Sequence, residues 1–195
     1  FHGVKVKIAE DGEILVSGEN VMNGYWNDPD ATSKTLINGW VHTGDIGEFD
    51  DEDYLKITDR KKDILVNAGG DNISPTRVEA KLDIEPEIAQ SMLYGDYKNY
   101  LVAVIVPDKD FAINWAKDNS KDQVFESIVK DEDFIKTMKE IVNKVNKNLS
   151  VIEQVRKFIL IDHEFTIENS MMTVSMKVRR FAVKDKYGDQ LEKLY

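Results

Sequence analysis

The sequence predicts a mixed α/β (α+β) fold, in which a β-rich segment precedes a segment that alternates strands and helices. Residues 101–106 read Leu-Val-Ala-Val-Ile-Val, an unbroken apolar run that is typical of a buried central strand. Between Phe134 and Leu149, apolar residues recur at spacings of one, three and four, which predicts an amphipathic helix with Lys and Glu on its outer face. Alternating residues at 4–8 predict a strand near the start of the chain.

The first 59 residues are expected to be β-rich. Further strands are predicted at 13–16 and 54–57, each after a turn segment rich in Asp or Gly. A short helix is predicted at 31–36. Trp26 is interpreted as a core anchor rather than as a stacking platform for a ligand.

The rest of the chain, residues 60–195, is expected to be α/β. Its further strands are predicted at 64–66, 91–95 and 158–161, and its helices at 74–82 and in two segments after residue 108. Residues 164–176 lack any periodicity and are rich in Ser, Thr and Asn, which predicts a mobile loop.

The bulk properties argue against several classes of function. The formal net charge of −10 does not suit a nucleic-acid-binding surface, because phosphate neutralisation needs clustered Lys and Arg. The absence of cysteine excludes disulfides and thiol nucleophiles and suits a reducing cytoplasm. No apolar run approaches the roughly 20 residues of a membrane span, although peripheral contact with lipid stays open. Because the chain enters a strand directly after Phe1, we expect it to be a piece of a longer protein.

A run of glycines, acids and bases at residues 40–75 is the first candidate for ligand binding. Asp45 directly follows a glycine, where the backbone can turn sharply and point the acid at a ligand, and the carboxylate could accept hydrogen bonds from a diol. Arg60 offers a guanidinium fork suited to ribose or phosphate oxygens. Gly69 and Gly70 bend the chain just before a predicted helix start.

A basic segment after the polar loop is the second candidate. Residues 177–186 contain five bases and one acid in an otherwise acidic chain, and this reversal of sign suggests an anionic partner. Lys177 could reach across a cleft from the loop as a compact point charge and steady negative charge at a phosphate. The alternative is a solvated basic surface run without a ligand.

Three segments, in order, resemble signatures of one enzyme family. Residues 18–26 read Gly-Glu-Asn-Val-Met-Asn-Gly-Tyr-Trp, residues 39–45 read Gly-Trp-Val-His-Thr-Gly-Asp, and residues 59–79 contain the paired glycines. The chain thereby resembles the carboxy-terminal part of AMP-forming acyl-CoA synthetases, members of the adenylate-forming superfamily, and most of all long-chain fatty acid–CoA ligases. The resemblance implies that residues 1–59 are the β-rich tail of the large N-terminal AMP-binding domain. Residues 60–195 would then be the small, mobile C-terminal α/β domain.

The resemblance also assigns roles to the candidate residues. It implies that Lys177 is the catalytic lysine of the adenylating step, and that Asp45 and Arg60 bind the ribose of the nucleotide. Lys62 corresponds to the hinge about which the small domain swings. The pair Gly69-Gly70 corresponds to a loop that lines the tunnel for the pantetheine arm of CoA in the thioester step.

Structural alternatives stay open for these positions. Asp45 could be a turn residue that satisfies nearby backbone amides. Arg60 could form a surface ion pair with Asp59 or Asp63. Lys62 could be an ordinary exposed lysine, because a hinge depends on backbone torsion rather than on side-chain chemistry. The glycine pair could be a plain turn that feeds a helix, which is compatible with a role in binding.

The loop before Lys177 departs from the family pattern. Relatives commonly carry a glycine near Ser170, a proline near Val174 and, in many branches, a glycine where this chain has Met176. Long-chain members often carry a bulky residue at the last position, so Met176 is a mild departure. Ser170 and Val174 bear on the flexibility of the loop, and so on its rate of closure, more than on the identity of the lysine.

The implied parent reaction has two halves. Fatty acid and ATP, with Mg²⁺ on its phosphates, give acyl-adenylate and pyrophosphate, and CoA then displaces AMP. No His, Asp and Glu cluster has metal-ligand spacing, and this piece alone is expected to be inactive because the family's phosphate-gripping loop lies upstream. An aryl or medium-chain acid ligase and a non-catalytic α/β interaction module are the alternatives. A cytoplasmic location is expected, with membrane association left open.

Overall fold

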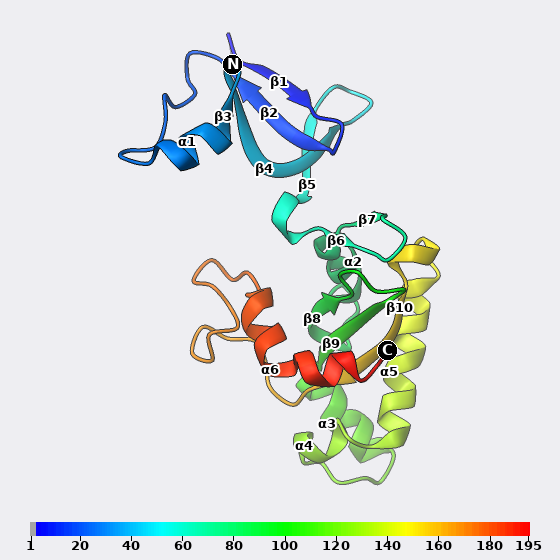
Figure 1. Cartoon of the computed structure of the whole chain (residues 1–195). Helices are drawn as coiled ribbons and strands as arrows, with labels where there is room; N and C mark the ends of the chain where they lie inside the picture. The colour runs from blue at the N-terminus through cyan, green and yellow to red at the C-terminus, as the bar shows by residue number, and fades with distance from the viewer. Residues whose placement is uncertain (1–2) are drawn as a thin grey trace. The chain divides into compact units, whose positions relative to one another are not determined.

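The computed structural model describes residues 3–195, which divide after Ile64 into two compact units (Figure 1). We call them the N-terminal unit and the C-terminal unit, and each is described by itself. The domain division expected between residues 59 and 60 stays a prediction. Within residues 3–195, every helix is too short or too polar to cross a lipid bilayer.

The N-terminal unit is built on one antiparallel sheet. Its strands follow the order β1 (Lys5–Ile8), β2 (Glu13–Ser17), β4 (Trp40–Phe49) and β3 (Leu36–Ile37), and β5 (Leu55–Arg60) also pairs with β4. Helix α1 (Pro29–Thr35) and the 3₁₀ helix η1 (Lys61–Asp63) complete the unit. Asp28 caps α1 by accepting a hydrogen bond from the Ala31 amide at 2.9 Å. The β-rich character predicted for this segment is confirmed.

Strand β4 runs through the segment in which the sequence allows a turn. Residues 43–45 all lie inside β4, and a hairpin connects β4 to β5, as the sequence indicates for this run. Gly44 adopts a left-handed backbone with φ of +72°, and the pairing of β4 with β2 shifts register beside it. The glycine therefore introduces a local irregularity of the bulge type rather than a chain reversal, and the strand continues beyond it.

The two tryptophans of this unit have different environments. Trp26 is 92% exposed, so its interpretation as a core anchor is wrong. It lies in the turn before α1, where Asn27 has a left-handed backbone with φ of +49° and the chain has left the sheet. Trp40 is half-buried in β4, and Lys7 Nζ lies 4.2 Å from the centroid of its ring. The sheet therefore shelters Trp40 and not Trp26.

The C-terminal unit is organised around a three-stranded sheet in the order β10 (Val155–Leu160), β9 (Leu101–Pro107) and β8 (Ile88–Tyr94). β9 pairs parallel with β10 and antiparallel with β8. Every residue of β9 is buried, which confirms the predicted central strand. A separate two-stranded ribbon consists of β6 (Leu65–Val66) and β7 (Asn72–Ile73).

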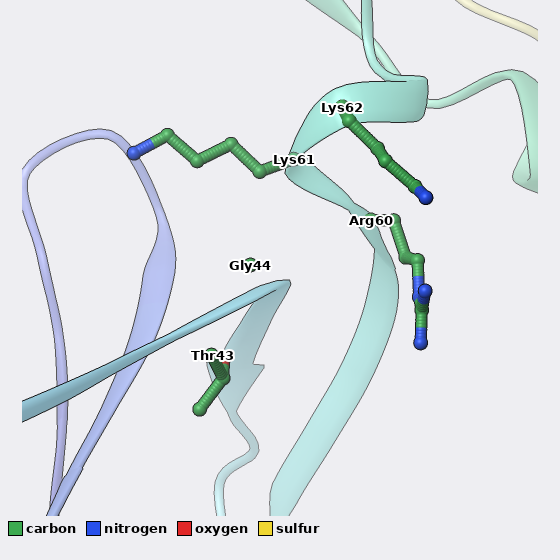
Figure 2. Close-up of a pocket in the computed structure, with 5 residues that line it drawn as sticks. All are labelled: Thr43, Gly44, Arg60, Lys61 and Lys62. Atoms are coloured by element: carbon green, nitrogen blue, oxygen red, sulfur yellow. The ribbon is translucent and has the colours of Figure 1, made fainter. Parts of the chain in front are cut away.

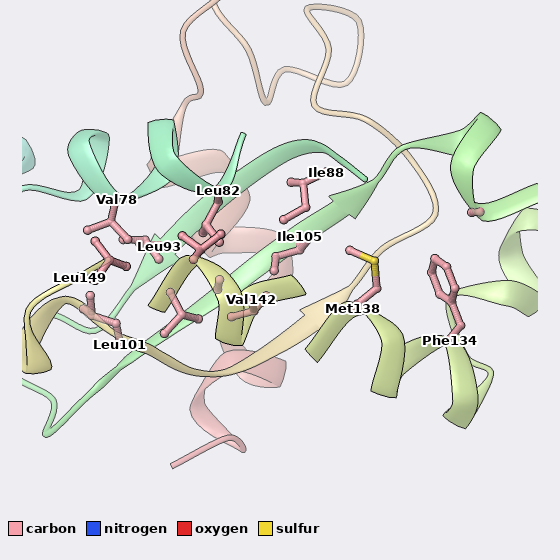
Figure 3. Packing of buried hydrophobic residues seen from close by; sticks show 14 of the residues in the cluster. Val78, Leu82, Ile88, Leu93, Leu101, Ile105, Phe134, Met138, Val142 and Leu149 are labelled. Carbon is pink, nitrogen blue, oxygen red and sulfur yellow. The ribbon is translucent and has the colours of Figure 1, made fainter. Parts of the chain in front are cut away.

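Both faces of this sheet are covered, which explains why β9 is apolar at every position. The helices of the C-terminal unit are α2 (Pro75–Leu82), α3 (Lys109–Asp118), α4 (Phe125–Ile128), α5 (Glu132–Asn146) and α6 (Arg180–Glu192), with a 3₁₀ helix η2 (Val151–Glu153). Leu101 and Ile105 of β9 pack with α2 and α5 in one core, shown in Figure 3. Val102 and Val104 face the opposite core, which includes Val183 of α6. The predicted amphipathic helix is α5, whose buried side chains join the first core.

The second core contains residues that the sequence interpretation placed in a loop. Phe165, Met171 and Met172, inside the predicted loop at 164–176, are at most 7% exposed. Their burial ties this segment to the sheet, so the loop is better anchored than its polar composition indicates. Helix α6 was missed, although Val183 opens a series of apolar residues at a spacing of four that marks its buried face.

Candidate functional site

An open pocket of about 390 Å³ lies within the N-terminal unit (Figure 2). We call it the N-terminal pocket, and it is lined by Thr43, Gly44, Arg60, Lys61 and Lys62. Three consecutive basic residues, 60–62, thus line the same pocket as Gly44 of β4. Figure 2 shows the Lys61 side chain extended away from those of Arg60 and Lys62. Such a pocket has the positive charge that an anionic ligand requires.

The two proposed ribose-binding residues lie together. Asp45 of β4 and Arg60 of β5 are paired across the ladder, and Arg60 Nε lies 3.3 Å from Asp45 Oδ1. The Arg60 amide also donates to Asp59 Oδ1 at 2.7 Å. Thr43 Oγ1 accepts a hydrogen bond from the Asp45 amide at 3.1 Å, which fixes the backbone at the carboxylate.

Glu13 is a buried acid beneath the pocket that sequence reasoning missed. It is 4% exposed, and its Oε1 accepts a hydrogen bond from the Gly44 amide at 2.9 Å. Its Oε2 accepts one from Lys61 Nζ at 3.0 Å and lies 2.9 Å from His42 Nδ1. Lys61 Nζ also reaches Asp11 Oδ2 at 2.6 Å. Glu13 therefore holds both the strand glycine and one of the three bases of the pocket.

The charges of this cluster reinforce one another. Burial alone would raise the pKa of the Glu13 carboxyl, but the hydrogen bonds from His42, Lys61 and the Gly44 amide outweigh burial and lower it below its ordinary value. The hydrogen bonds to Asp11 and then to Glu13 raise the pKa of Lys61. The Lys61 ammonium in turn lowers the pKa of Asp11. All three groups are consequently charged near neutral pH.

The glycine loop of the C-terminal unit is a tight turn between β6 and β7. We use this name for residues 67–71. Asn67 Oδ1 accepts hydrogen bonds from the amides of Gly69 and Asp71, both at 2.9 Å, and Asn67 Nδ2 donates to Asp71 Oδ2 at 2.9 Å. Gly70 has φ of +86°, a conformation that favours glycine. The glycine loop leads through β7 into α2, so it is a turn before a helix. Its two glycines are also exposed, which is compatible with a role in ligand binding.

Lys177 lies in a short hairpin that leads into α6. We call residues 171–179 the Lys177 hairpin. The Thr173 amide donates to the Lys177 carbonyl at 2.8 Å, and the Lys177 amide donates to Thr173 Oγ1 at 3.0 Å. Met172 and Val178 form an isolated antiparallel bridge. The Lys177 side chain is exposed, so its ammonium group is presented to solvent from an ordered backbone.

Two residues of this region have left-handed backbones. Ser170 has φ of +62° and Met176 has φ of +59°. The family resemblance implies a glycine near the first position and, in many branches, a glycine at the second. Residues other than glycine are strained in this conformation, because they carry a Cβ atom. Ser170 and Met176 therefore keep a left-handed backbone, at a cost in conformational free energy.

The structure groups the predicted site residues by unit. Asp45, Arg60 and Lys62 belong to the N-terminal unit, where Arg60 contacts Asp45 and lines the N-terminal pocket with Lys62. The glycine loop and Lys177 belong to the C-terminal unit and lie on two separate loops. Over residues 3–195, no three His, Asp or Glu side chains are grouped so that they could hold a metal ion.

The C-terminal unit presents the glycine loop and the Lys177 hairpin, as the resemblance to adenylate-forming enzymes implies. Residues 62–195 match the family model described as "AMP-binding enzyme C-terminal domain". Because this match covers more than half of the chain, the chain belongs to the AMP-binding enzyme family.

Curated relatives cover nearly the whole chain. It is 36% identical over 195 residues to long-chain-fatty-acid–CoA ligase FadD15 of Mycobacterium tuberculosis, a match that covers 99% of this chain and 32% of that protein. It is 34% identical over 189 residues to human long-chain-fatty-acid–CoA ligase 1, with 95% and 27% covered. The chain thus spans about a third or less of the length of these relatives.

Solved structures agree on the fold. The adenylation domain of a carboxylate reductase from Mycobacterium chelonae aligns with a TM-score of 0.80 at 25% identity, over 98% of this chain and 30% of that one. The A domain of the carboxylic acid reductase from Segniliparus rugosus, in complex with AMP and a co-purified carboxylic acid, aligns with a TM-score of 0.75 at 25% identity, over 98% and 31%. The mixed α/β fold predicted from the sequence is confirmed.

Proposed function

We propose that this chain is the carboxy-terminal part of an AMP-forming long-chain fatty acid–CoA ligase. The observation that carries the proposal is the 36% identity, over essentially the whole chain, to a protein named for this activity. The match of residues 62–195 to the AMP-binding C-terminal domain supports it. The chain supplies the mobile domain and the end of the nucleotide-binding domain, and the rest of the parent supplies the acid pocket.

In the first half-reaction, a carboxylate oxygen of the fatty acid attacks the α-phosphorus of ATP and pyrophosphate leaves. Lys177 carries an exposed ammonium group on a hydrogen-bonded hairpin, so it can enter the site and balance the charge that develops on the phosphate. Asp45 accepts hydrogen bonds from the ribose hydroxyls, and Arg60 donates to ribose oxygens beside it. Mg²⁺ comes on the ATP phosphates, since the described residues supply no acid cluster for it.

In the second half-reaction, the thiol of CoA attacks the acyl carbonyl carbon, and AMP leaves with the electron pair of the broken bond. The glycine loop lines the approach of the pantetheine arm, because Gly69 and Gly70 carry no side chain that would block it. Rotation about Lys62 exchanges the Lys177 hairpin for the glycine loop. One small domain thereby serves two different transition states.

The test is a comparison of the two half-reactions in the full-length parent with Lys177→Ala. Pyrophosphate exchange should fall by at least about 100-fold, because one charge-stabilising donor of this kind contributes roughly 10²–10³ to a rate. Thioester formation from supplied acyl-adenylate should stay within a few-fold of the wild type. Lys193→Ala, which removes an equally charged and exposed lysine near the end of α6, is the matched control. Equal loss of both half-reactions would contradict the assignment of Lys177.

The acid that is activated follows from the names of the relatives rather than from a pocket in this chain. A related structure, the o-succinylbenzoate CoA synthetase from Bacillus subtilis, aligns at 26% identity with a TM-score of 0.67, and its name denotes an aromatic acid. Thioester formation by the parent should therefore be compared between long-chain fatty acids and aromatic acids. A preference for aromatic acids would replace the fatty acid in the proposal. The 195-residue piece alone should show no pyrophosphate exchange.

A further inference from the structure

An ion pair between α2 and α6 lies at the foot of the Lys177 hairpin. Glu79 of α2 is 8% exposed, and the guanidinium of Arg180 spans both of its carboxylate oxygens. Arg180 Nη1 donates to Glu79 Oε1 at 2.6 Å, while Nη2 donates to Oε2. The same Oε1 accepts the Leu93 amide of β8 at 2.6 Å. A buried carboxylate requires partners for its charge. The two Nη groups of the guanidinium donate to its two oxygens, and this bidentate contact has one fixed geometry.

Arg180 lies where the Lys177 hairpin joins α6, so its ion pair with Glu79 bears on the orientation of the hairpin. Arg180 is the first residue of α6 and follows Lys177 by three residues, so its guanidinium fixes the point at which the hairpin joins the helix. The Arg179 amide beside it donates to the Met171 carbonyl at 2.7 Å and closes the foot of the hairpin. The other partner, Glu79, belongs to the helix that the glycine loop feeds. One ion pair therefore connects the helices next to both proposed functional loops.

We propose that Arg180 is a positioning residue, which through Glu79 holds the Lys177 hairpin in the orientation that presents its lysine. This inference rests on the proposed function for its catalytic consequence, but its structural content does not. The rest of α6 is anchored by buried side chains that begin at Val183, one turn later. Without the pair, the hairpin and the first turn of α6 lose their tie to α2, while the remainder of the helix stays packed.

The structural test uses hydrogen exchange, measured by NMR, in the 195-residue chain. Arg180→Gln should speed the exchange of the Thr173 and Arg179 amides about tenfold, because both amides are bonded within the hairpin. The amides of β9, which lie in the fully buried strand, should keep their wild-type rates. Arg179→Gln is the matched control, since it removes the same charge from the adjacent, exposed position. Equal exchange in the Arg180 and Arg179 variants would overturn the proposal.

A second variant covers the case in which loss of the Arg180 charge beside the Glu79 carboxylate unfolds the unit. The double variant Glu79→Gln/Arg180→Gln removes both charges of the ion pair together. Faster exchange in the hairpin with unchanged exchange in β9 supports the proposal. Wild-type exchange in the hairpin of the double variant overturns it.

The catalytic test uses the full-length parent and separates this inference from the proposed function. Arg180→Gln should lower the kcat of adenylation about tenfold with little change in the KM for ATP, because the residue positions the lysine and does not touch the nucleotide. Arg180→Lys should recover part of this loss, since it restores the charge without the fork. Loss of the thioester step to the same extent would overturn the proposal. If Lys177→Ala leaves adenylation intact, the proposed function fails, whereas the exchange experiment still decides the positioning role.

Discussion

Removal of the Glu13 side chain should destabilise the N-terminal unit locally, at the glycine of β4. Glu13→Ala leaves the Gly44 amide without its acceptor and takes a partner from Lys61 and from His42. A hydrogen bond to a buried carboxylate contributes roughly 1.5–3 kcal/mol. The Lys61 contact adds less than about 1 kcal/mol, because its ammonium is half-exposed and keeps Asp11. A loss of about 3 kcal/mol in the free energy of local opening follows.

Hydrogen exchange at the Gly44 amide is the assay that reports this opening directly. A loss of about 3 kcal/mol corresponds to exchange roughly 100-fold faster. Glu13→Gln keeps an oxygen acceptor for the amide and loses only the charge, so its effect should be about 1 kcal/mol. Glu10→Gln is the control, because that acid is exposed in the turn just before β2. If Gly44 exchanges at the wild-type rate in Glu13→Ala, the hydrogen bond does not hold the strand and the reasoning is refuted.

Two further predictions concern the C-terminal unit. Met176→Gly should stabilise it by about 0.5–1 kcal/mol in a denaturant titration, since relief of the left-handed strain at φ of +59° exceeds the entropy that glycine adds to the unfolded chain; destabilisation would contradict this. Burial raises the pKa of Asp83 to about 6 despite a hydrogen bond from Ser91, with a contribution from the nearby charge of Glu79. The folded protein binds the proton of the Asp83 carboxyl more tightly than the unfolded chain does, so the stability that Asp83 contributes should fall as pH rises from about 4 to 6. Asp83→Asn should remove this dependence of stability on pH. An NMR titration of the Asp83 carboxyl with a midpoint near 4 would contradict the prediction.

Periodicity predicted the elements whose burial is itself periodic. β9 was predicted because both of its faces are covered, which leaves no polar position in the strand. α5 was predicted because one face packs on the sheet while the other is solvated. In both cases the environment of each residue repeats with the geometry of the element, so the sequence alone carries the pattern.

The features that were missed depend on contacts between distant parts of the chain. Glu13 meets His42, Gly44 and Lys61, which follow it by 29, 31 and 48 residues, and nothing local distinguishes it from other strand acids. The irregularity at Gly44 has a related origin, because β2 and β5 pair with β4 on either side and keep the strand continuous through its glycine.

The ion pairs of Lys61 limit where rotation between the proposed functional states can occur. Lys61 is held by Asp11 and Glu13, so the chain is fixed to the N-terminal unit up to the residue before the proposed hinge. β6 begins the C-terminal unit at Leu65. We predict that residues 62–64 absorb the change in torsion. A loosened Lys61 would lengthen that segment, so Glu13→Ala in the parent should slow the exchange between half-reactions more than either half-reaction measured separately.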